Sequence, residues 1–160
     1  SVSVGMKALI QNVNKTKVSS GGAFISVMGP GLLVFLGLYQ NDTEKDADYI
    51  VDTVLNTQLF EEMRNDTPKA KAVKWARNVM EKGYGVTCLA EISLVNTLKG
   101  GTPSFGAAMD VEKGQRLYQY VIDTLGHKYN MDKIKQSKFL GPHLVDVHLT
   151  NGITVYLETP

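Results

Sequence analysis

The sequence predicts an α/β fold in which a mixed β-sheet forms a single domain with two to three helices. Apolar segments of strand length occur in pairs, and amphipathic segments of helical period separate the pairs. No internal repeat or low-complexity linker divides the 160 residues, a length that fits one domain and buries a core without disulfides. We assign residues 6–160 to this domain and residues 1–5 to an N-terminal extension.

Three strands are expected in the first part of the chain. Residues 6–13 alternate apolar and polar side chains, as in a half-buried strand. Residues 23–28 form a second apolar segment, which ends at the turn sequence Gly-Pro-Gly at 29–31. The apolar run at 32–38 is continuous, which is typical of a central strand covered on both faces.

Three segments show helical signals. Asn-Asp-Thr at 41–43 precedes a segment with apolar residues every three or four positions, and residues 110–125 show the same period. Thr-Pro at 67–68 is a further start signal, so residues 69–82 are interpreted as a third, basic helix. Trp75 on this helix is interpreted as a packing residue, with a stacking platform as the alternative.

The remaining segments predict strands. Residues 86–94 are expected to form one strand, and residues 145–157 a terminal hairpin. The hairpin is indicated by alternating apolar residues on both sides of Asn151-Gly152, the preferred dipeptide of a two-residue turn.

The composition limits the classes of function. Lys plus Arg number 17 and Asp plus Glu 16, so the net charge of +1 gives no argument about nucleic acid, and RNA binding would need a local patch. No apolar run approaches the length of a membrane span. Cys88 is the single cysteine and is interpreted as a small core residue, which favours a reducing, cytoplasmic location. The three histidines show no zinc spacing, and we expect neither a metal nor an organic cofactor.

Two neighbouring segments carry polar groups suited to a site. Glu91 and Ser93 place a carboxylate and a hydroxyl at the end of a buried strand, where loops usually build sites. The polar loop at 99–105 contains two glycines, which would let its backbone approach a ligand. Because Ser and Glu end many strands, a scaffold role is the alternative.

Four segments, in order along the chain, resemble the D-aminoacyl-tRNA deacylases, also called D-tyrosyl-tRNA deacylases: 6–13, 31–38, 46–54 and 99–105. The similarity extends over nearly the whole chain from Met6, which is identified as a divergent member. The resemblance implies a mixed α/β domain that forms a homodimer, with each active site at the subunit interface. It also implies hydrolysis of the ester bond of D-aminoacyl-tRNA, with aminoacyl-tRNA and a second copy of the chain as partners and no membrane.

The family's Ser-Gln-Phe-Thr-Leu stretch, which lines its active site, aligns with residues 90–94. The hydroxyl position is kept, but a carboxylate replaces a neutral amide that both donates and accepts hydrogen bonds. The resemblance implies that the backbone amides of two of these residues stabilise an oxyanion. The implied catalytic residues are Ser93, Ile92 and Glu91, and the implied substrate contacts are Ala90, Leu94, Lys99, Gly100, Pro103 and Phe105.

A second family stretch, Asn-x-Gly-Pro-Val-Thr, reaches across from the partner subunit and excludes L-amino acids. It falls at Asn151, Gly152, Ile153 and Thr154, which are further substrate-binding candidates, but the proline is absent here. An arginine usual in the first strand is replaced by Asn12.

The expected basic helix offers candidate contacts to the tRNA backbone, namely Lys69, Lys71, Lys74 and Arg77, with a solvated basic face as the alternative. The changed motifs leave two other functions open. One is a catalytically degenerate paralogue that acts as a nucleic-acid-binding or interaction module. The other is a deacylase with altered chirality or glycine selectivity.

Overall fold

A six-stranded mixed sheet forms the centre of the computed structural model, which describes residues 5–20, 23–65, 68–140 and 143–160. The sheet order is β10-β1-β3-β6-β9, and β2 also pairs with β1. β1 is antiparallel to β2, β3 and β10, whereas β3–β6 and β6–β9 are parallel pairs. The strands are β1 (Lys7–Ser20), β2 (Ala23–Met28), β3 (Gly31–Gly37), β6 (Gly85–Ala90), β9 (Ile134–Lys135) and β10 (Leu144–Glu158).

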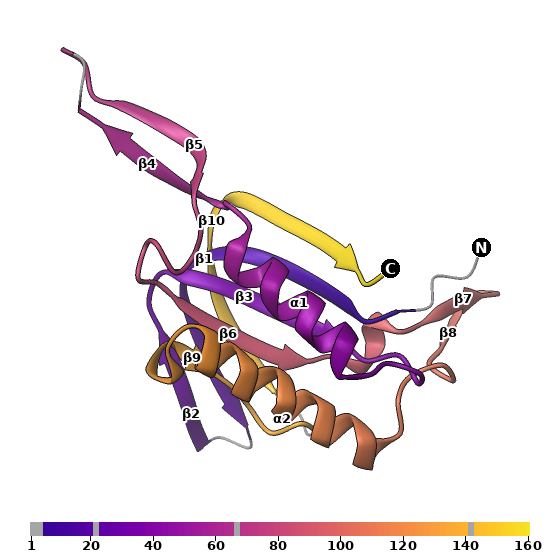
Figure 1. Cartoon of the computed structure of the whole chain (residues 1–160). Coiled ribbons are helices and arrows are strands. Elements are labelled where there is room, and N and C mark those ends of the chain that lie inside the picture. The colour runs from indigo at the N-terminus through magenta and orange to yellow at the C-terminus, as the bar shows by residue number, and fades with distance from the viewer. Residues whose placement is uncertain (1–4, 21–22, 66–67, 141–142) are drawn as a thin grey trace.

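Two α-helices, α1 (Glu44–Asn56) and α2 (Val111–Lys128), lie next to each other on one face of this sheet (Figure 1). The predicted start signal of α1 is confirmed, because the amide of Thr43 donates to the Asp46 carboxylate at 2.9 Å. At the start of α2 the Asp110 carboxylate accepts from the Lys113 amide at 3.0 Å. The short 3-10 helix η2 (Met131–Lys133) then leads into β9. Within the described residues, neither helix is long and apolar enough to cross a membrane.

The core has two parts because β3 is buried on both faces. A large cluster between the sheet and the helices includes Leu36 and Val34 from β3. A smaller cluster, formed by Val13, Val18, Met28, Leu33 and Leu89, lies on the opposite face of the sheet. The sequence prediction of a central strand covered on both sides is therefore confirmed.

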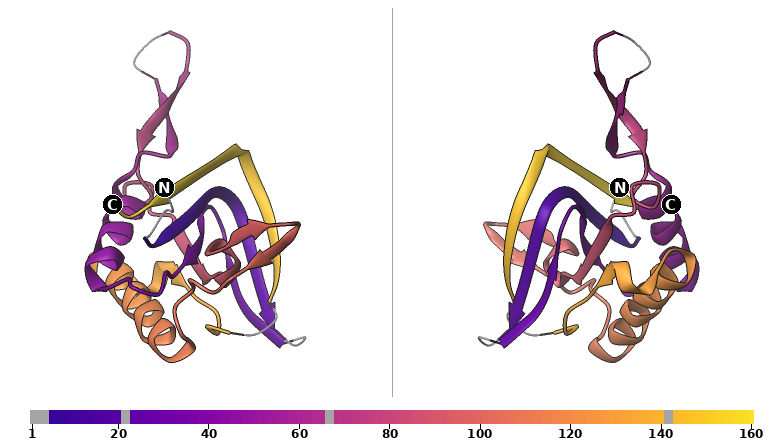
Figure 2. Two further views of the ribbon diagram at one scale, coloured as in Figure 1. Left: turned by 90° about the vertical axis from the view of Figure 1, so that its right-hand side faces the viewer. Right: turned by 90° about the vertical axis from the view of Figure 1, so that its left-hand side faces the viewer.

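The predicted third helix is wrong, because residues 69–82 belong to a β-hairpin that projects from the body of the protein (Figures 1 and 2). Its strands are β4 (Phe60–Arg64) and β5 (Lys71–Arg77). A projecting helix would have nothing to cover its apolar stripe, whereas the hairpin pairs its own backbone groups. Thr67 of the predicted start signal lies outside the described residues. Asn78 and Glu81 form a capping pair, because the side chain of each accepts from the other's amide, and Gly83 at φ +66° ends that turn.

The predicted terminal hairpin is also wrong, because β10 is one strand that pairs along most of β1. Gln11 pairs with Thr154 and Val13 with Leu149, so residues 150–153 of β10 lie opposite residue 12 alone. This bulge bends β10, as Figure 2 shows, and Gly152 supplies its positive φ of +64°. The Asn-Gly dipeptide thus has the backbone freedom expected of it, but the length of β1 directs both halves of β10 to the same partner.

Candidate functional site

The family-like segment lies where β6 ends. The expected strand at 86–94 stops at Ala90, and one more sheet hydrogen bond follows, from the Glu91 amide to the Leu36 carbonyl at 2.8 Å. The chain then turns into the 3-10 helix η1 (Ile92–Leu94). A Cβ atom at Gly37 would lie only 2.8 Å from the Cβ of Leu94, so the glycine at the end of β3 makes room for this turn.

Glu91 caps this turn with its own carboxylate. Its Oε1 accepts the Ser93 hydroxyl at 2.6 Å and lies 3.4 Å from the Ser93 amide nitrogen, which also donates to it. Because both groups donate to the carboxylate, Glu91 fixes the orientation of the Ser93 hydroxyl. The neutral amide of the family pattern would make weaker contacts here than a carboxylate does.

The backbone amides of η1 differ in whether they donate a hydrogen bond within the protein. The Leu94 amide donates to the Glu91 carbonyl at 3.2 Å and the Val95 amide to the Ile92 carbonyl at 3.0 Å. Of the two amides expected to be oxyanion donors, that of Ser93 is engaged by the Glu91 carboxylate. That of Ile92 has no hydrogen-bond acceptor in the part of the chain that the structure describes. One donor is thus available and the other is covered by an internal anion.

The neighbours of this turn come from segments far apart in the sequence. Together with Glu91 and Ile92, the side chains of Ala108, Met109 and Phe139 line a cleft of about 10 Å³, which holds no more than about one water molecule. Sequence reasoning missed these three residues. The available signal was Gly114 within α2, where a Cβ atom would lie 2.6 Å from the Phe139 ring.

The predicted polar loop is a small hairpin of β7 (Thr97–Lys99) and β8 (Thr102–Ser104). Its tip is formed by Gly100 and Gly101, both at positive φ, and Lys99, Pro103 and Phe105 are exposed. The chain after this hairpin is held against the end of β3, where the Met109 amide donates to the Leu38 carbonyl at 3.0 Å. This attachment places Ala108 and Met109 beside the motif, where both line the cleft at Glu91.

The candidates at 151–154 lie elsewhere. β10 is separated from β6 by β1 and β3, and Ile153 lines two cavities at the root of the β4–β5 hairpin instead of the cleft at Glu91. Asn12, which replaces the family arginine, is buried there and donates from Nδ2 to the Leu59 carbonyl at 2.5 Å. One copy of the chain therefore does not bring the two family motifs together.

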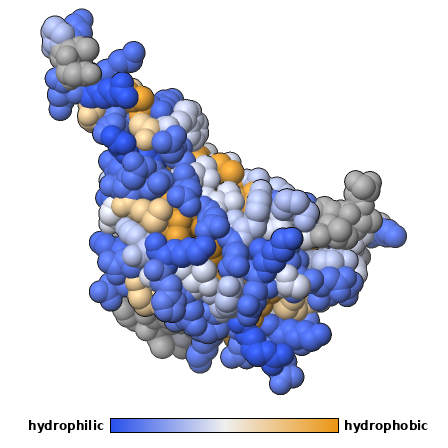
Figure 3. Space-filling model, viewed as in Figure 1, coloured by the Kyte–Doolittle hydropathy of each residue, from blue (hydrophilic) through white to orange (hydrophobic). Residues whose placement is uncertain are grey.

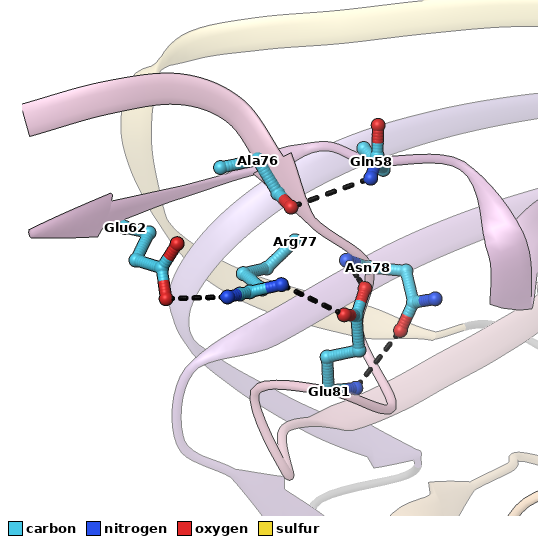
Figure 4. Close-up of polar contacts among 6 residues, drawn as sticks. All are labelled: Gln58, Glu62, Ala76, Arg77, Asn78 and Glu81. Carbon is cyan, nitrogen blue, oxygen red and sulfur yellow. Dashed lines mark hydrogen bonds and ion pairs between the residues drawn. The ribbon is translucent and has the colours of Figure 1, made fainter. Parts of the chain in front are cut away.

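The four basic candidates differ in how they are held. Arg77 forms ion pairs with Glu62 at 2.6 Å and with Glu81 at 3.2 Å, so its guanidinium is engaged at the hairpin root (Figure 4). In the same view the side-chain amide of Gln58 donates to the Ala76 carbonyl at 3.3 Å. Lys69, Lys71 and Lys74 lie farther out along the hairpin with exposed side chains.

Titratable groups near the motif are shifted mainly by burial. Burial raises the pKa of the Cys88 thiol to about 12, so it stays protonated at neutral pH, and the prediction of an inert core cysteine is confirmed. Burial also raises the pKa of Asp42 to about 6, against the hydrogen bond it accepts from the Tyr39 amide. Asp42 lines a cavity of about 470 Å³ between α1 and α2. Met109 lines both this cavity and the cleft at Glu91.

Comparisons with known proteins identify the family of the chain. The family profile described as D-Tyr-tRNA(Tyr) deacylase matches residues 9–158. A D-aminoacyl-tRNA deacylase of Drosophila melanogaster is 37% identical over 157 residues, 97% of this chain and 93% of the relative. D-aminoacyl-tRNA deacylase 1 of Homo sapiens is 34% identical over 157 residues, 97% of this chain and 71% of the relative.

Solved structures with the same fold agree. One described as c-Myc DNA Unwinding Element Binding Protein has a TM-score of 0.86 at 32% identity, with 96% of this chain and 99% of that chain covered. A probable eukaryotic D-amino acid tRNA deacylase has a TM-score of 0.80 at 12% identity, covering 98% and 100%, which supports the fold alone. The family resemblance predicted from the motifs is confirmed, and the chain belongs to the D-Tyr-tRNA(Tyr) deacylase family of ester hydrolases.

Proposed function

We propose that this chain hydrolyses the ester bond of D-aminoacyl-tRNA through backbone amides of the η1 turn and releases the D-amino acid and free tRNA. The observation that carries the proposal is the Ile92 amide, which lies at the first position of the turn. An aminoacyl ester is already activated, so a site that positions it and stabilises the developing oxyanion is sufficient. Such chemistry belongs to the cytoplasm, where charged tRNA is used.

The amide can be removed without removing the turn. Proline is tolerated at the first position of a helix, and Glu91, at φ −134° and ψ 98°, has the extended backbone that a residue before proline requires. We expect Ile92→Pro to lower kcat by about 10²-fold to 10³-fold, as the loss of one oxyanion donor does elsewhere, while Ile92→Ala has a small effect. Equal turnover by the two variants would remove the Ile92 amide from the mechanism.

The direct assay compares D-tyrosyl-, L-tyrosyl- and glycyl-tRNA, with enzyme-free reactions to correct for spontaneous hydrolysis. Turnover of D-tyrosyl-tRNA alone supports the proposal. Turnover of the L-ester or the glycyl ester instead means altered selectivity, for which the bulge at 150–153 in place of a Gly-Pro pair is the structural reason. Binding without turnover supports the degenerate paralogue, which the capping of Ser93 by Glu91 favours.

The proposal includes a homodimer in which each site is completed by the partner. It is supported by the small volume of the cleft at Glu91, about 10 Å³, and by the position of residues 151–154 away from that cleft. Sedimentation equilibrium and activity measured over the same concentration range test this. We expect the turnover per chain to fall as the dimer dissociates; a constant turnover in a monomeric sample would overturn it.

A further inference from the structure

The only tryptophan of the chain, Trp75, lies on the projecting β4–β5 hairpin with 54% of its side chain exposed. The family motifs do not use it, and the mechanism proposed above assigns it no part. The surface seen in Figure 3 is mostly hydrophilic along the hairpin, with hydrophobic residues showing near its root. Single exposed hydrophobic residues are common on protein surfaces, so exposure alone does not mark Trp75 as a site. The conformation of its backbone does set it apart.

The backbone around Trp75 is irregular in two ways. Phe60 pairs with Arg77 and Glu62 with Val73, so residues 74–76 of β5 bulge opposite residue 61 alone. Trp75, in the middle of this bulge, has a φ of +55°, and it is the only residue other than glycine with a positive φ in the described part of the chain. A bulky side chain in the left-handed region is strained, and such strain concentrates at ligand sites. A bulge also turns a side chain away from the normal alternation of the strand.

A cavity beside the indole gives the site its size. It has a volume of about 220 Å³ and is lined by Trp75, Phe60, Ile153, Leu59, Lys74 and Glu61. This is smaller than the pockets that hold drug-sized ligands, which suits a single planar ring system. The aromatic and aliphatic walls favour the face of such a ring, and the Glu61 carboxylate disfavours a phosphate inside the cavity.

The charges around the cavity favour a polyanion outside it. Residues 60–82 contain six Lys and Arg against four Asp and Glu, a net +2, whereas the whole chain has a net +1. Arg77 is engaged by Glu62 and Glu81. Lys74, which lines the cavity, and Lys71, four residues before Trp75 in β5, have exposed side chains. An aromatic platform with flanking lysines is the arrangement that binds single-stranded nucleic acid.

We propose that Trp75 stacks on an unpaired nucleobase of a single strand, while Lys71 and Lys74 contact its phosphates. If the proposed deacylase function holds, the unpaired 3′ end of tRNA is the natural source of this base. Other single-stranded RNA or DNA offers the same chemistry. The site concerns binding alone, so an unacylated strand tests it whether or not the protein hydrolyses an ester.

Because Trp75 is the only tryptophan, its fluorescence reports directly on the site. We expect saturable quenching by an unacylated eight-nucleotide RNA, by the matching DNA and by a tRNA acceptor hairpin with an unpaired 3′ end. A blunt hairpin without the unpaired end should quench much less. Absence of quenching by all of these strands would overturn the proposal.

Variants separate stacking from charge. By anisotropy of a labelled strand, we expect Trp75→Leu to weaken binding about tenfold and Trp75→Phe only about twofold to threefold. Lys74→Ala should weaken binding and reduce the slope of the logarithm of the binding constant against the logarithm of salt concentration by about one, as expected for the loss of one phosphate contact. The matched controls are Tyr49→Ala and Lys45→Ala on α1, which remove an exposed aromatic residue and a lysine outside the hairpin. Both should leave binding unchanged.

A stability measurement distinguishes a ligand site from a structural one. Glycine adopts a positive φ without strain, so Trp75→Gly should raise the midpoint of urea unfolding above that of Trp75→Ala, yet bind the strand as poorly. If Trp75→Gly is much less stable than the wild type, although glycine removes the strain, the indole is a packing residue. Emission that changes with protein concentration alone, together with dimer formation, would assign the surface to a second copy of the chain instead.

Discussion

Replacing Glu91 with glutamine should increase the rate of ester hydrolysis, because the carboxylate lies where negative charge must develop. Its Oε1 is 3.4 Å from the Ser93 amide nitrogen, one of the two proposed oxyanion donors. An oxyanion bound to that amide would lie roughly 4 Å from the carboxylate charge. Two unit charges at this distance repel by about 1 kcal/mol in water and by about 4 kcal/mol at the effective dielectric constant of a protein surface.

Removing this repulsion predicts that Glu91→Gln raises kcat between about fivefold and about 10³-fold. Glutamine keeps the size of the side chain and an oxygen that accepts the Ser93 hydroxyl, so the turn should persist. The assay is single-turnover deacylation of D-tyrosyl-tRNA, with Glu112→Gln as a matched control that removes an exposed carboxylate from α2.

The kinetic constant that changes in Glu91→Gln distinguishes two kinds of repulsion. Repulsion of the tRNA phosphates by Glu91 would appear mainly in KM and weaken with added salt, whereas repulsion of the oxyanion appears in kcat. A Glu91→Gln variant with lower kcat than the wild type would refute the reasoning, because the carboxylate would then be helping the reaction.

Three further changes follow from single contacts. Asp42→Asn should raise the free energy of unfolding by about 1 kcal/mol at pH 8 and change it little at pH 4. Because the pKa of Asp42 is raised to about 6, the folded state favours the protonated carboxyl, and this contribution to stability is lost as the pH rises from about 4 to 6. The half-exposed position of Asp42 reduces the size of the change in stability. Urea titrations at both pH values check this. Glu158→Gln should cost about 2 kcal/mol at pH 7, since Lys7, 9% exposed, pairs with Glu158 at 2.9 Å. The Tyr156 hydrogen bond and Lys7 lower the pKa of Glu158, so this difference should narrow in acid, and a gap that persists at pH 3 would contradict it. Gly37→Ala should cost about 1–3 kcal/mol and reduce turnover by displacing Leu94. Gly106→Ala serves as the control in thermal unfolding, because a Cβ atom there would make only an ordinary contact, 3.9 Å from the Ser104 hydroxyl oxygen.

The sequence predicted the elements in which the spacing of apolar residues matches one kind of secondary structure throughout. β3 reads as an unbroken apolar run, and it is covered on both faces. α1 and α2 each carry an apolar stripe and a capping residue, and both begin where those residues predict. In these elements local preference and tertiary packing agree, which is the condition for reading structure from a pattern.

The two wrong predictions have a common cause: each misread segment has a strand partner that lies outside it. The Asn-Gly pair at 151–152 favours a tight turn, but β1 is long enough to pair with both halves of β10. The period of Val73, Ala76 and Met80 fits a helix, but β4 supplies a strand partner and nothing covers a helical stripe there. A window of the sequence contains neither fact, because each depends on a segment elsewhere in the chain.

The candidate site was predictable in its motif but not in its surroundings. Residues 90–94 were identified by their similarity to the family stretch, and the turn they form is the one that presents backbone amides. The capping of Ser93 by Glu91 depends on the end of β6 at Ala90, which the expected strand to residue 94 did not contain. The lining by Met109 and Phe139 depends on how α2 and its flanking loops return to the sheet.

The strain at Trp75 persists because the root of the hairpin, and not β5 itself, sets the register. A left-handed tryptophan costs about 1–2 kcal/mol. The root contains two ion pairs of Arg77 and the buried side chains of Phe60 and Val79, and each of these buried side chains is worth roughly 1.5–3 kcal/mol. These contacts exceed the strain, so β4 and β5 stay paired on both sides of the bulge and the indole remains displayed. Weakening the root with Arg77→Ala should therefore release the bulge and reduce strand binding, although the variant leaves Trp75 and both exposed lysines in place.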